Sequence, residues 1–458
     1  SYYTSTRVVK NLISRLSFQE PVKVLDPCCG TGNFLLQLPD VLPFDSIYGN
    51  DIDAVSVKIT RLNMALKYNV PVTAIYEHIT EQDYLTDYAE KDFQYIIGNP
   101  PWGYDFSEEE LSHLRTIYKS ATGKTIESYD VFIEQALNHL TANGHLAYVL
   151  PEAILNVKAH TNIRKTILEN CSIKNLVFLG NAFDGVQCPC IILDLQCTRS
   201  PLSTVGMNVN TGTDSFTINI ERTVSDEYFS FTTSDAEYNI MCKIKNMPNS
   251  AYLRGNADFA LGIVTGNNKE YISDIKNDNN EMILKGADIR KYHTTRTNNY
   301  IVFKPENFQQ AAPTEMYRSP EKLLYRFISS QLVFAYDDKQ TLSLNSCNIV
   351  IPRLPGTKIK YVLAILNSKI AQFIYKKEFN SVKVLRSHIE NIPIPTADAS
   401  TQAEIIALTD KLISGLQADE AEKVYDELDL LVSKAFNLDS NEIEIINKAV
   451  EGDNKFLA

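Results

Sequence analysis

The chain has 458 residues, more than one ordinary hydrophobic core holds, so at least two domains are expected. Hydrophobic residues make up 44%, as in globular proteins, and no apolar stretch is long enough to span a bilayer, so we expect a cytoplasmic protein without a membrane partner. The net charge of −12 argues against nucleic acid binding over the whole surface, because phosphate contacts require Lys and Arg.

The charge is unevenly distributed along the chain. Counts of charged residues give −8 for residues 1–225, +5 for 226–396 and −9 for 397–458. The middle part is therefore the one suited to a nucleic acid partner.

The eight cysteines include no Cys-x-x-Cys pair, and the seven histidines are scattered. This pattern indicates neither a metal site nor a disulfide framework. We expect reduced, mostly buried thiols.

The first elements along the chain are typical of a parallel α/β sheet. Val22–Asp26 reads as a buried strand, Pro27–Asn33 as a glycine loop that opens a helix, and Ser46–Asn50 as a strand that ends in Asp51. This order indicates a nucleotide-cofactor half-domain, in which ligands lie at the carboxyl ends of the strands. Asp51 stands where an acid binds ribose hydroxyls, whereas Asp53 is expected to cap the next helix.

The following segments continue the pattern. Residues 54–67 have helical spacing, 72–76 read as a third strand, and the apolar run 93–98 reads as a fourth. Glycines at positions 30 and 32 let the backbone approach a ligand closely.

The fourth strand leads directly into Asn99-Pro100-Pro101-Trp102. Proline has no N–H and keeps the preceding residue extended, so the Asn99 amide oxygen and the Pro100 carbonyl are free to accept hydrogen bonds. With Trp102 beside them, they would form a cradle for a planar base that carries an amino group. Taken alone, the tetrapeptide is equally well read as a rigid turn.

Two motifs together resemble the gamma class of adenine-specific DNA amino-methyltransferases of bacterial restriction-modification systems. These are the loop Asp26–Gly32, which matches Asp-Pro-x-Cys-Gly-x-Gly, and Asn99–Trp102, about seventy residues later. The resemblance implies an α/β, Rossmann-like methyltransferase fold with a seven-stranded mixed sheet. It also implies a second α+β target-recognition domain and a helical C-terminal tail.

The resemblance implies that the cofactor is S-adenosylmethionine. Asp26 would lie beside its methionine amino group, while Asp83 would meet the adenine amine and Tyr84 would lie on the adenine ring. Thr4 matches the threonine of a segment that packs over the cofactor, although Ser5 replaces the usual proline and Thr4 also reads as a helix cap. The implied cofactor residues are Thr4, Asp26, Gly30, Gly32, Asn33, Asp51, Ile52, Asp83 and Tyr84.

The resemblance also assigns the catalytic residues Asn99, Pro100, Pro101 and Trp102. Residues 103–128 would form a loop over the substrate pocket, followed by a helix over 129–137 and a strand over 145–150. Phe183 follows the next expected strand, 174–179, and precedes 189–195. It would stack on a flipped-out base opposite Trp102, although an aromatic residue at such a turn usually packs on the core.

Beyond residue 200 the pattern changes to short β-like runs and turns. We expect a catalytic domain over 1–200, a target-recognition domain over 225–396 and a helical tail over 397–458. Segments such as 365–369 and 391–395 resemble target-recognition domains. The candidate DNA contacts are Lys269, Arg290, Lys291 and Arg296, for which a plain charged surface is the alternative.

The expected function is methylation of the exocyclic N6 amine of adenine in double-stranded DNA by a monomer, with a possible separate or fused restriction endonuclease. Methylation of RNA or of a protein amide would use a similar Asn-Pro-Pro-aromatic motif, and cytosine methylation typically uses Ser-Pro-Pro. An inactive DNA-specificity component is the non-enzymatic alternative.

Overall fold

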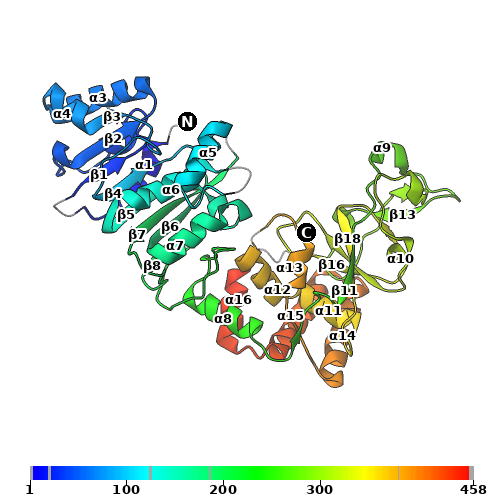
Figure 1. Ribbon diagram of the computed structural model, residues 1–458. Helices are drawn as coiled ribbons and strands as arrows, with labels where there is room; N and C mark the ends of the chain where they lie inside the picture. The colour runs from blue at the N-terminus through cyan, green and yellow to red at the C-terminus, as the bar shows by residue number, and fades with distance from the viewer. Residues whose placement is uncertain are drawn as a thin grey trace. The chain divides into compact units, whose positions relative to one another are not determined.

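The computed structural model describes residues 4–18, 22–122, 126–183, 185, 187–379 and 381–452. Residues 123–125, which belong to the loop expected over 103–128, lie outside this description. The chain forms two compact units, Ser1–Asp235 and Ala236–Ala458 (Figure 1). Each is described by itself.

The first unit is built on a mixed sheet that has nine strands within the described residues, in the order β3-β2-β1-β4-β5-β7-β6-β8-β9. The five strands from β3 to β5 run parallel, β7 is antiparallel to both β5 and β6, and β8 is parallel to β6. The strands are β1 (Val24–Asp26), β2 (Ile47–Asp51), β3 (Ile79–Glu81), β4 (Phe93–Gly98), β5 (Leu140–Pro151), β6 (Cys171–Asn181), β7 (Pro189–Cys197), β8 (Met207–Asn210) and β9 (Ser215–Ile218).

The unit has the α/β class expected from the sequence, a mixed sheet with helices on both sides. Six of the seven strands expected from the sequence correspond to strands of this sheet, namely β1, β2, β4, β5, β6 and β7. Within the described residues, β8 and β9 extend the sheet to nine strands, so the expected number was too low.

The central strands are apolar on both faces because helices cover both sides. Along β5, Leu146 and Tyr148 belong to one core, whereas Ala147 and Val149 belong to the other. This alternation is the period of two that a strand imposes on its side chains. The helices α1 to α4 contribute to the core of Ala147, and α5 to α7 contribute to that of Tyr148. They are α1 (Thr6–Ile13), α2 (Asn33–Leu36), α3 (Ala54–Tyr68), α4 (Val72–His78), α5 (Glu108–Ile117), α6 (Ser128–His139) and α7 (Thr161–Asn170).

The expected third strand over 72–76 was wrong, because this segment is the helix α4. Pro71 precedes its first turn, and of the apolar side chains only Ile75 is buried, while Val72 and Tyr76 are exposed. Five residues of mixed polarity do not distinguish a strand from a helical turn. The strand of this unit is β3, three residues further on.

The expectation of a loop over 103–128 was also wrong in part, because α5 occupies Glu108–Ile117. Ser107 and Glu110 form a capping box at its N-terminus, in which each side chain bonds the other residue's backbone N–H. The Ser-x-x-Glu spacing is itself a helix-start signal. Asp53, in contrast, caps α3 as expected and accepts a bond from the Ser56 N–H.

The second unit contains an antiparallel sheet in the order β11-β18-β15-β16. A further sheet has the order β12-β14-β13-β17, and β10 pairs with β19. The strands are β10 (Ser250–Ala251), β11 (Ala257–Ala260), β12 (Ile272–Ser273), β13 (Glu281–Leu284), β14 (Tyr300–Ile301), β15 (Lys322–Arg326), β16 (Phe334–Asp337), β17 (Leu342–Ser343), β18 (Cys347–Pro352) and β19 (Ile394–Pro395).

The first of these sheets separates two cores. Leu323 and Phe334 face a core shared with α11, α12, α14 and α15, whereas Leu324 and Ala335 face a core shared with the β13 sheet. The C-terminal helices thus belong to the second unit's core. The helices are α8 (Asp235–Lys245), α9 (Asn268–Tyr271), α10 (Thr314–Tyr317), α11 (Ile359–Asn367), α12 (Lys369–Ile374), α13 (Arg386–Glu390), α14 (Ala399–Ile413), α15 (Ala418–Ala435) and α16 (Ser440–Ala449).

Candidate active site at the carboxyl ends of the parallel strands

A cavity of about 940 Å³ lies in the first unit where β1, β2, β3 and β4 end. Parallel strands place their carboxyl ends at one edge of a sheet, so loops far apart in sequence meet there. Of the residues expected from the sequence to form the site, the cavity is lined by Thr4, Gly30, Asn33, Asp51, Ile52, Asp83, Tyr84, Asn99, Pro100, Pro101 and Trp102.

Asp26, the last residue of β1, has no exposed surface and is not among the residues that line this cavity, although its neighbours Pro27 and Cys28 are. Its Oδ1 accepts the Cys28 N–H at 3.2 Å, whereas its Oδ2 has no hydrogen-bond partner among the described residues. Burial raises the pKa of the Asp26 carboxyl to about 8, and the Cys28 hydrogen bond only partly opposes that rise. A buried carboxylate of this kind is suited to a cationic ligand.

The end of β4 passes very close to this carboxyl. A Cβ at Gly98 would stand 2.6 Å from Asp26 Oδ1, and Gly98 has a φ of +148°, a conformation that favours glycine. Only glycine therefore lets β4 deliver Asn99 beside the end of β1.

The two glycines of the loop after β1 differ in their surroundings. A Cβ at Gly30 would meet nothing within 4 Å, and the Gly30 N–H donates to Asp51 Oδ2 at 2.8 Å. Gly32 instead packs against Thr60, whose side chain lies 3.1 Å from an added Cβ, and Gly32 does not line the cavity. Gly30 is thus open toward the ligand space, and Gly32 allows close packing on α3.

The N-terminal segment is tied to this loop and to the Asn-Pro-Pro-Trp turn. The Asn33 side chain donates to the Thr4 carbonyl at 2.7 Å, and the Asn99 Nδ2 donates to Thr4 Oγ1 at 3.0 Å. The Thr4 hydroxyl therefore does not cap α1, whose cap is Ser5 without a side-chain bond. Of the two alternatives for Thr4, helix capping was wrong.

Tyr84 lines the cavity from the loop after β3 and is almost completely buried. Its ring packs with those of Tyr88, Phe132 and His139. The Asp83 Oδ1 accepts the Leu85 N–H at 2.8 Å, which fixes the bend of this loop.

Two further residues, Cys28 and Asn50, hold these loops together, and no sequence motif points to either of them. Cys28 stands at the variable position of the glycine loop, and its thiol donates to the Asn99 carbonyl at 3.3 Å. The Asn50 Nδ2 donates to the carbonyls of Pro27 and Gln82, which joins the loops after β1 and β3. An asparagine before the acid that ends a strand gives no sequence clue to this role.

The turn after β4 presents two hydrogen-bond acceptors, the Asn99 side-chain oxygen and the Pro100 carbonyl. Because Nδ2 of Asn99 is held by Thr4, the amide places its Oδ1 on the other side, where it is buried and has no partner among the described residues. The Trp102 ring lies in edge-to-face contact with that of Phe183, with centroids 5.0 Å apart. Phe183 itself is buried and does not line the cavity.

The expected DNA contacts of the second unit divide into two kinds. Lys269 and Arg296 are exposed, and Arg290 is half-buried with its guanidinium donating to the carbonyls of Ala287 and Ile289. Lys291 was the wrong candidate, because it is 4% exposed and its ammonium donates to the Asn367 carbonyl at 2.9 Å. Its methylene chain places the charge inside the unit, where burial lowers its pKa to about 8.

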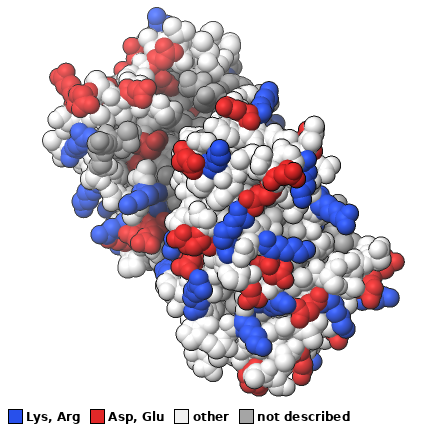
Figure 2. Space-filling model, turned by 90° about the vertical axis from the view of Figure 1, so that its right-hand side faces the viewer, with Lys and Arg blue, Asp and Glu red and all other residues white. Residues whose placement is uncertain are grey.

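The surface carries both signs of charge. On the face drawn in Figure 2, Lys and Arg side chains are interspersed with Asp and Glu. Among the described residues, no group of three His, Cys, Asp or Glu side chains could hold a metal ion, and all eight cysteines are free. None of the described helices has the length and apolar character needed to cross a membrane.

Comparisons with known proteins find a family match within each unit. Residues 1–222 match the family described as N-6 DNA Methylase, and residues 281–394 match the TaqI-like C-terminal specificity domain. The chain is 30% identical over 271 residues to the type II methyltransferase M.VspI of Vibrio sp. (strain 343), which covers 58% of this chain and 64% of that protein. It is also 30% identical over 160 residues to the type II methyltransferase M.CvrRI of Paramecium bursaria Chlorella virus XZ-6E, covering 35% and 38%.

The fold is also seen in a solved structure, that of the Type IIL restriction-modification enzyme MmeI in complex with DNA. The similarity covers 98% of this chain and 75% of that one, with a TM-score of 0.56 and 13% identity. The chain spans less than two thirds of the length of each of these two methyltransferases, M.VspI and M.CvrRI.

Proposed function

Because residues 1–222 match the family described as N-6 DNA Methylase, we propose that the chain is a site-specific DNA adenine methyltransferase of a restriction-modification system. It transfers a methyl group from S-adenosylmethionine to the N6 amine of an adenine rotated out of double-stranded DNA. One observation carries the proposal: the Asn99 Oδ1 is buried without a partner among the described residues, in a turn that lines the cavity.

The residues of the cavity, together with the buried Asp26, fit S-adenosylmethionine. Asp26 has a buried, unpartnered Oδ2 for the methionine ammonium, and Gly30 leaves open space where a side chain would intrude. Asp51 ends β2 where ribose hydroxyls are held, while Asp83 and Tyr84 receive the adenine. Bound there, the cofactor supplies an electrophilic methyl group on a sulfonium.

The chain's part in the reaction is to orient the acceptor amine. The Asn99 Oδ1 and the Pro100 carbonyl accept its two hydrogens, which favours a pyramidal nitrogen with its lone pair available for transfer. Thr4 fixes the Asn99 amide in the required orientation. No strong base is needed, because the nitrogen loses its proton after it has gained the methyl group. Catalysis by position and electrostatics of this kind is sensitive to small displacements.

Trp102 and Phe183 stabilise the rotated base. Rotation costs a few kcal/mol, and stacking on an aromatic side chain contributes roughly 1–3 kcal/mol per base, so two aromatic residues offset the cost. The second unit selects the site, and its exposed Lys269 and Arg296 and the half-buried Arg290 contact DNA.

The experiment that tests the proposal combines methyl transfer with sequencing. Tritiated S-adenosylmethionine is offered with unmethylated genomic DNA, with RNA and with protein, and the modified bases of the DNA are then sequenced. N6-methyladenine at one short sequence is the expected product. Label in RNA, in protein or at cytosine instead would overturn the proposal.

Asn99→Ala provides the matched variant. We expect it to bind S-adenosylmethionine as the wild type does in calorimetry, but to lose methyl transfer by 10²-fold or more, because one acceptor is gone. Wild-type turnover by this variant would remove Asn99 from the mechanism.

A further inference from the structure

Two of the four residues of the Asn99–Trp102 turn have no backbone donor. Pro100 and Pro101 have no N–H, so these two residues offer the rest of the protein only their carbonyls. The position of the turn therefore depends on groups that bond to its carbonyls and to the Asn99 side chain.

Three such bonds surround the turn. Thr4 accepts from the Asn99 Nδ2 at 3.0 Å, and the Cys28 thiol donates to the Asn99 carbonyl at 3.3 Å. The Ser128 hydroxyl donates to the Pro101 carbonyl at 2.5 Å. The Pro100 carbonyl lies between these fixed points and accepts no hydrogen bond from the described residues. The bonds thus hold the turn on both sides of the two free acceptors.

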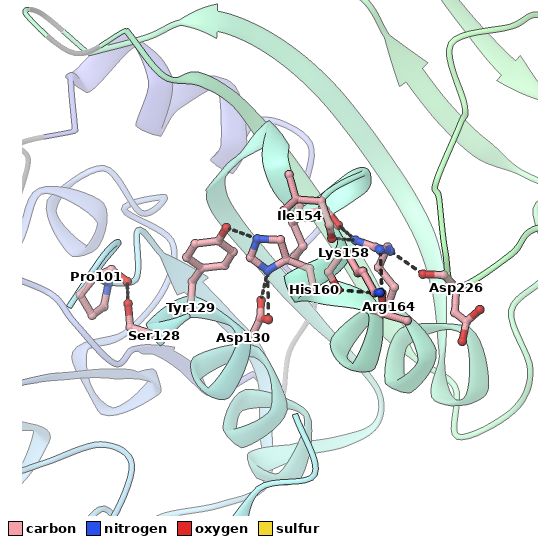
Figure 3. A network of polar contacts seen from close by, with 11 residues as sticks. Pro101, Ser128, Tyr129, Asp130, Ile154, Lys158, His160, Arg164 and Asp226 are labelled. Carbon is pink, nitrogen blue, oxygen red and sulfur yellow. Dashed lines mark hydrogen bonds and ion pairs between the residues drawn. The ribbon is translucent and has the colours of Figure 1, made fainter. Parts of the chain in front are cut away.

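Ser128 comes from a distant and firmly held element. It is the first residue of α6, has no exposed surface and lines the cavity. Figure 3 shows its hydroxyl directed at the Pro101 carbonyl. On the same turn of α6, the Tyr129 hydroxyl bonds His160 Nε2 at 2.8 Å, and Asp130 bonds the other ring nitrogen at 2.9 Å.

Those neighbours anchor the start of α6. His160 belongs to the short helix η3 (Lys158–His160), and Tyr129, Asp130 and His160 are all buried. Arg164 then ties the same region together by donating to the Ile154 and Val157 carbonyls. Ser128 is consequently presented to the turn from a rigid support.

We propose that Ser128 is a positioning residue for methyl transfer: by holding the Pro101 carbonyl, it directs the neighbouring Pro100 carbonyl toward the acceptor amine. The inference rests on the proposed function, because it names a residue that sets the geometry of the same site. Without the Ser128 hydroxyl, nothing among the described residues bonds either proline carbonyl, and the second acceptor loses its fixed place.

The test is Ser128→Ala, measured in single turnover on the DNA sequence that the wild type methylates. We expect the methyl-transfer rate to fall about ten- to a hundred-fold, since a misplaced reacting group costs up to 10²-fold. The dissociation constants for S-adenosylmethionine and DNA should stay within about twofold, because Ser128 holds the turn rather than either ligand.

Tyr129→Phe is the matched control, because it also removes one buried hydroxyl from the first turn of α6. It leaves intact both the Pro101 bond and the Asp130–His160 bond, which still anchors this turn. We expect a lower midpoint of thermal unfolding and a methyl-transfer rate close to that of the wild type. Equal loss of rate in both variants, or no loss in Ser128→Ala, would overturn the positioning role while leaving the proposed function in place. A wild-type protein that methylates no DNA would overturn both.

Discussion

The rings of Trp102 and Phe183 stand edge to face, with their planes at 88° and their centroids 5.0 Å apart. Two rings that hold a base between them must turn their faces toward it, so this contact and a stacked base exclude each other. Entry of an adenine therefore requires at least one of the two rings to move.

Trp102 is the single tryptophan of the chain, so its emission reports this movement directly. We expect a duplex with the methylated site to change the tryptophan fluorescence in the presence of S-adenosylhomocysteine, because the indole exchanges Phe183 for a base. A duplex of scrambled sequence should leave the emission nearly unchanged. In Phe183→Ala the free protein should already differ from the wild type. Equal responses to both duplexes would contradict a base-stacking role for Trp102.

Asp26 gives a prediction for the pH dependence of stability. Its pKa is raised from 3.8 to about 8 by burial, so between these values the folded chain holds a proton that the unfolded chain has released. The free energy of unfolding should therefore fall as the pH rises from about 4 to 8, with a slope of up to about 1.4 kcal/mol per pH unit from this group. Chemical denaturation of the wild type and Asp26→Asn across this range checks it. The substitution should remove that part of the slope.

Cofactor binding should reverse the protonation of Asp26. At pH 7 the free carboxyl is largely protonated, and a methionine ammonium beside it would favour the carboxylate. Calorimetric titration with S-adenosylmethionine in buffers of different ionisation enthalpy should therefore report the release of up to one proton. Asp26→Asn should release none and bind more weakly. A wild-type enthalpy independent of the buffer would show that Asp26 does not meet the ammonium.

The substitution Gly98→Ala tests whether β4 must pass as close to Asp26 of β1 as it does in the structure. Gly98→Ala would place a Cβ 2.6 Å from Asp26 Oδ1 at a φ of +148°, so we expect a loss of about 1–3 kcal/mol in stability and weaker cofactor binding. Gly206→Ala is the control, since its φ is +85° but its Cβ would meet nothing within 4 Å. It should cost about 1–2 kcal/mol and leave cofactor binding unchanged. Equal binding by both variants would argue against the close approach.

Substitutions of Lys291 and Arg296 should distinguish a cation that stabilises the fold from one that contacts DNA. Lys291→Met removes a buried ammonium that bonds the Asn367 carbonyl and the Tyr425 hydroxyl, so it should change thermal stability but not the salt dependence of DNA binding. Arg296→Ala should leave stability unchanged and lower the slope of log K against log salt by about 1. Fluorescence anisotropy at several salt concentrations distinguishes the two, and a lowered slope in Lys291→Met would restore it as a DNA contact.

The strands that the sequence predicts well are those with strong apolar runs. The run 93–98 is recovered as β4 residue for residue, and the acid after the second strand is Asp51 at the cavity. The run 72–76 failed because a five-residue segment of mixed polarity fits a helical turn equally well. The helix α5 was missed although Ser107 and Glu110 carry the capping-box spacing.

The candidate site likewise contains residues that the sequence predicts and residues that it does not. Most residues of the two motifs line the cavity, because a motif is recognised from local order along the chain, but Asp26 and Gly32 do not line it. The partners that hold them could not be located from the sequence, since Cys28, Asn50 and Ser128 act through contacts with carbonyls 71, 23 and 27 residues away. Burial likewise decides the role of Lys291, and nothing in its local sequence distinguishes it from Arg290.

The hydrogen bonds of Lys291 to Asn367 and Tyr425 have a consequence for engineering by exchange of the specificity domain. The matched specificity segment ends at residue 394, but Lys291 within it bonds Tyr425 on α15, and Tyr425 also bonds the Asn367 carbonyl. A chimera that moves only residues 281–394 of this chain into another protein would bury Lys291 against a foreign helix. A transplant that extends through α16 would keep lysine, asparagine and tyrosine from one parent, and the junction would then lie beyond the core that they share.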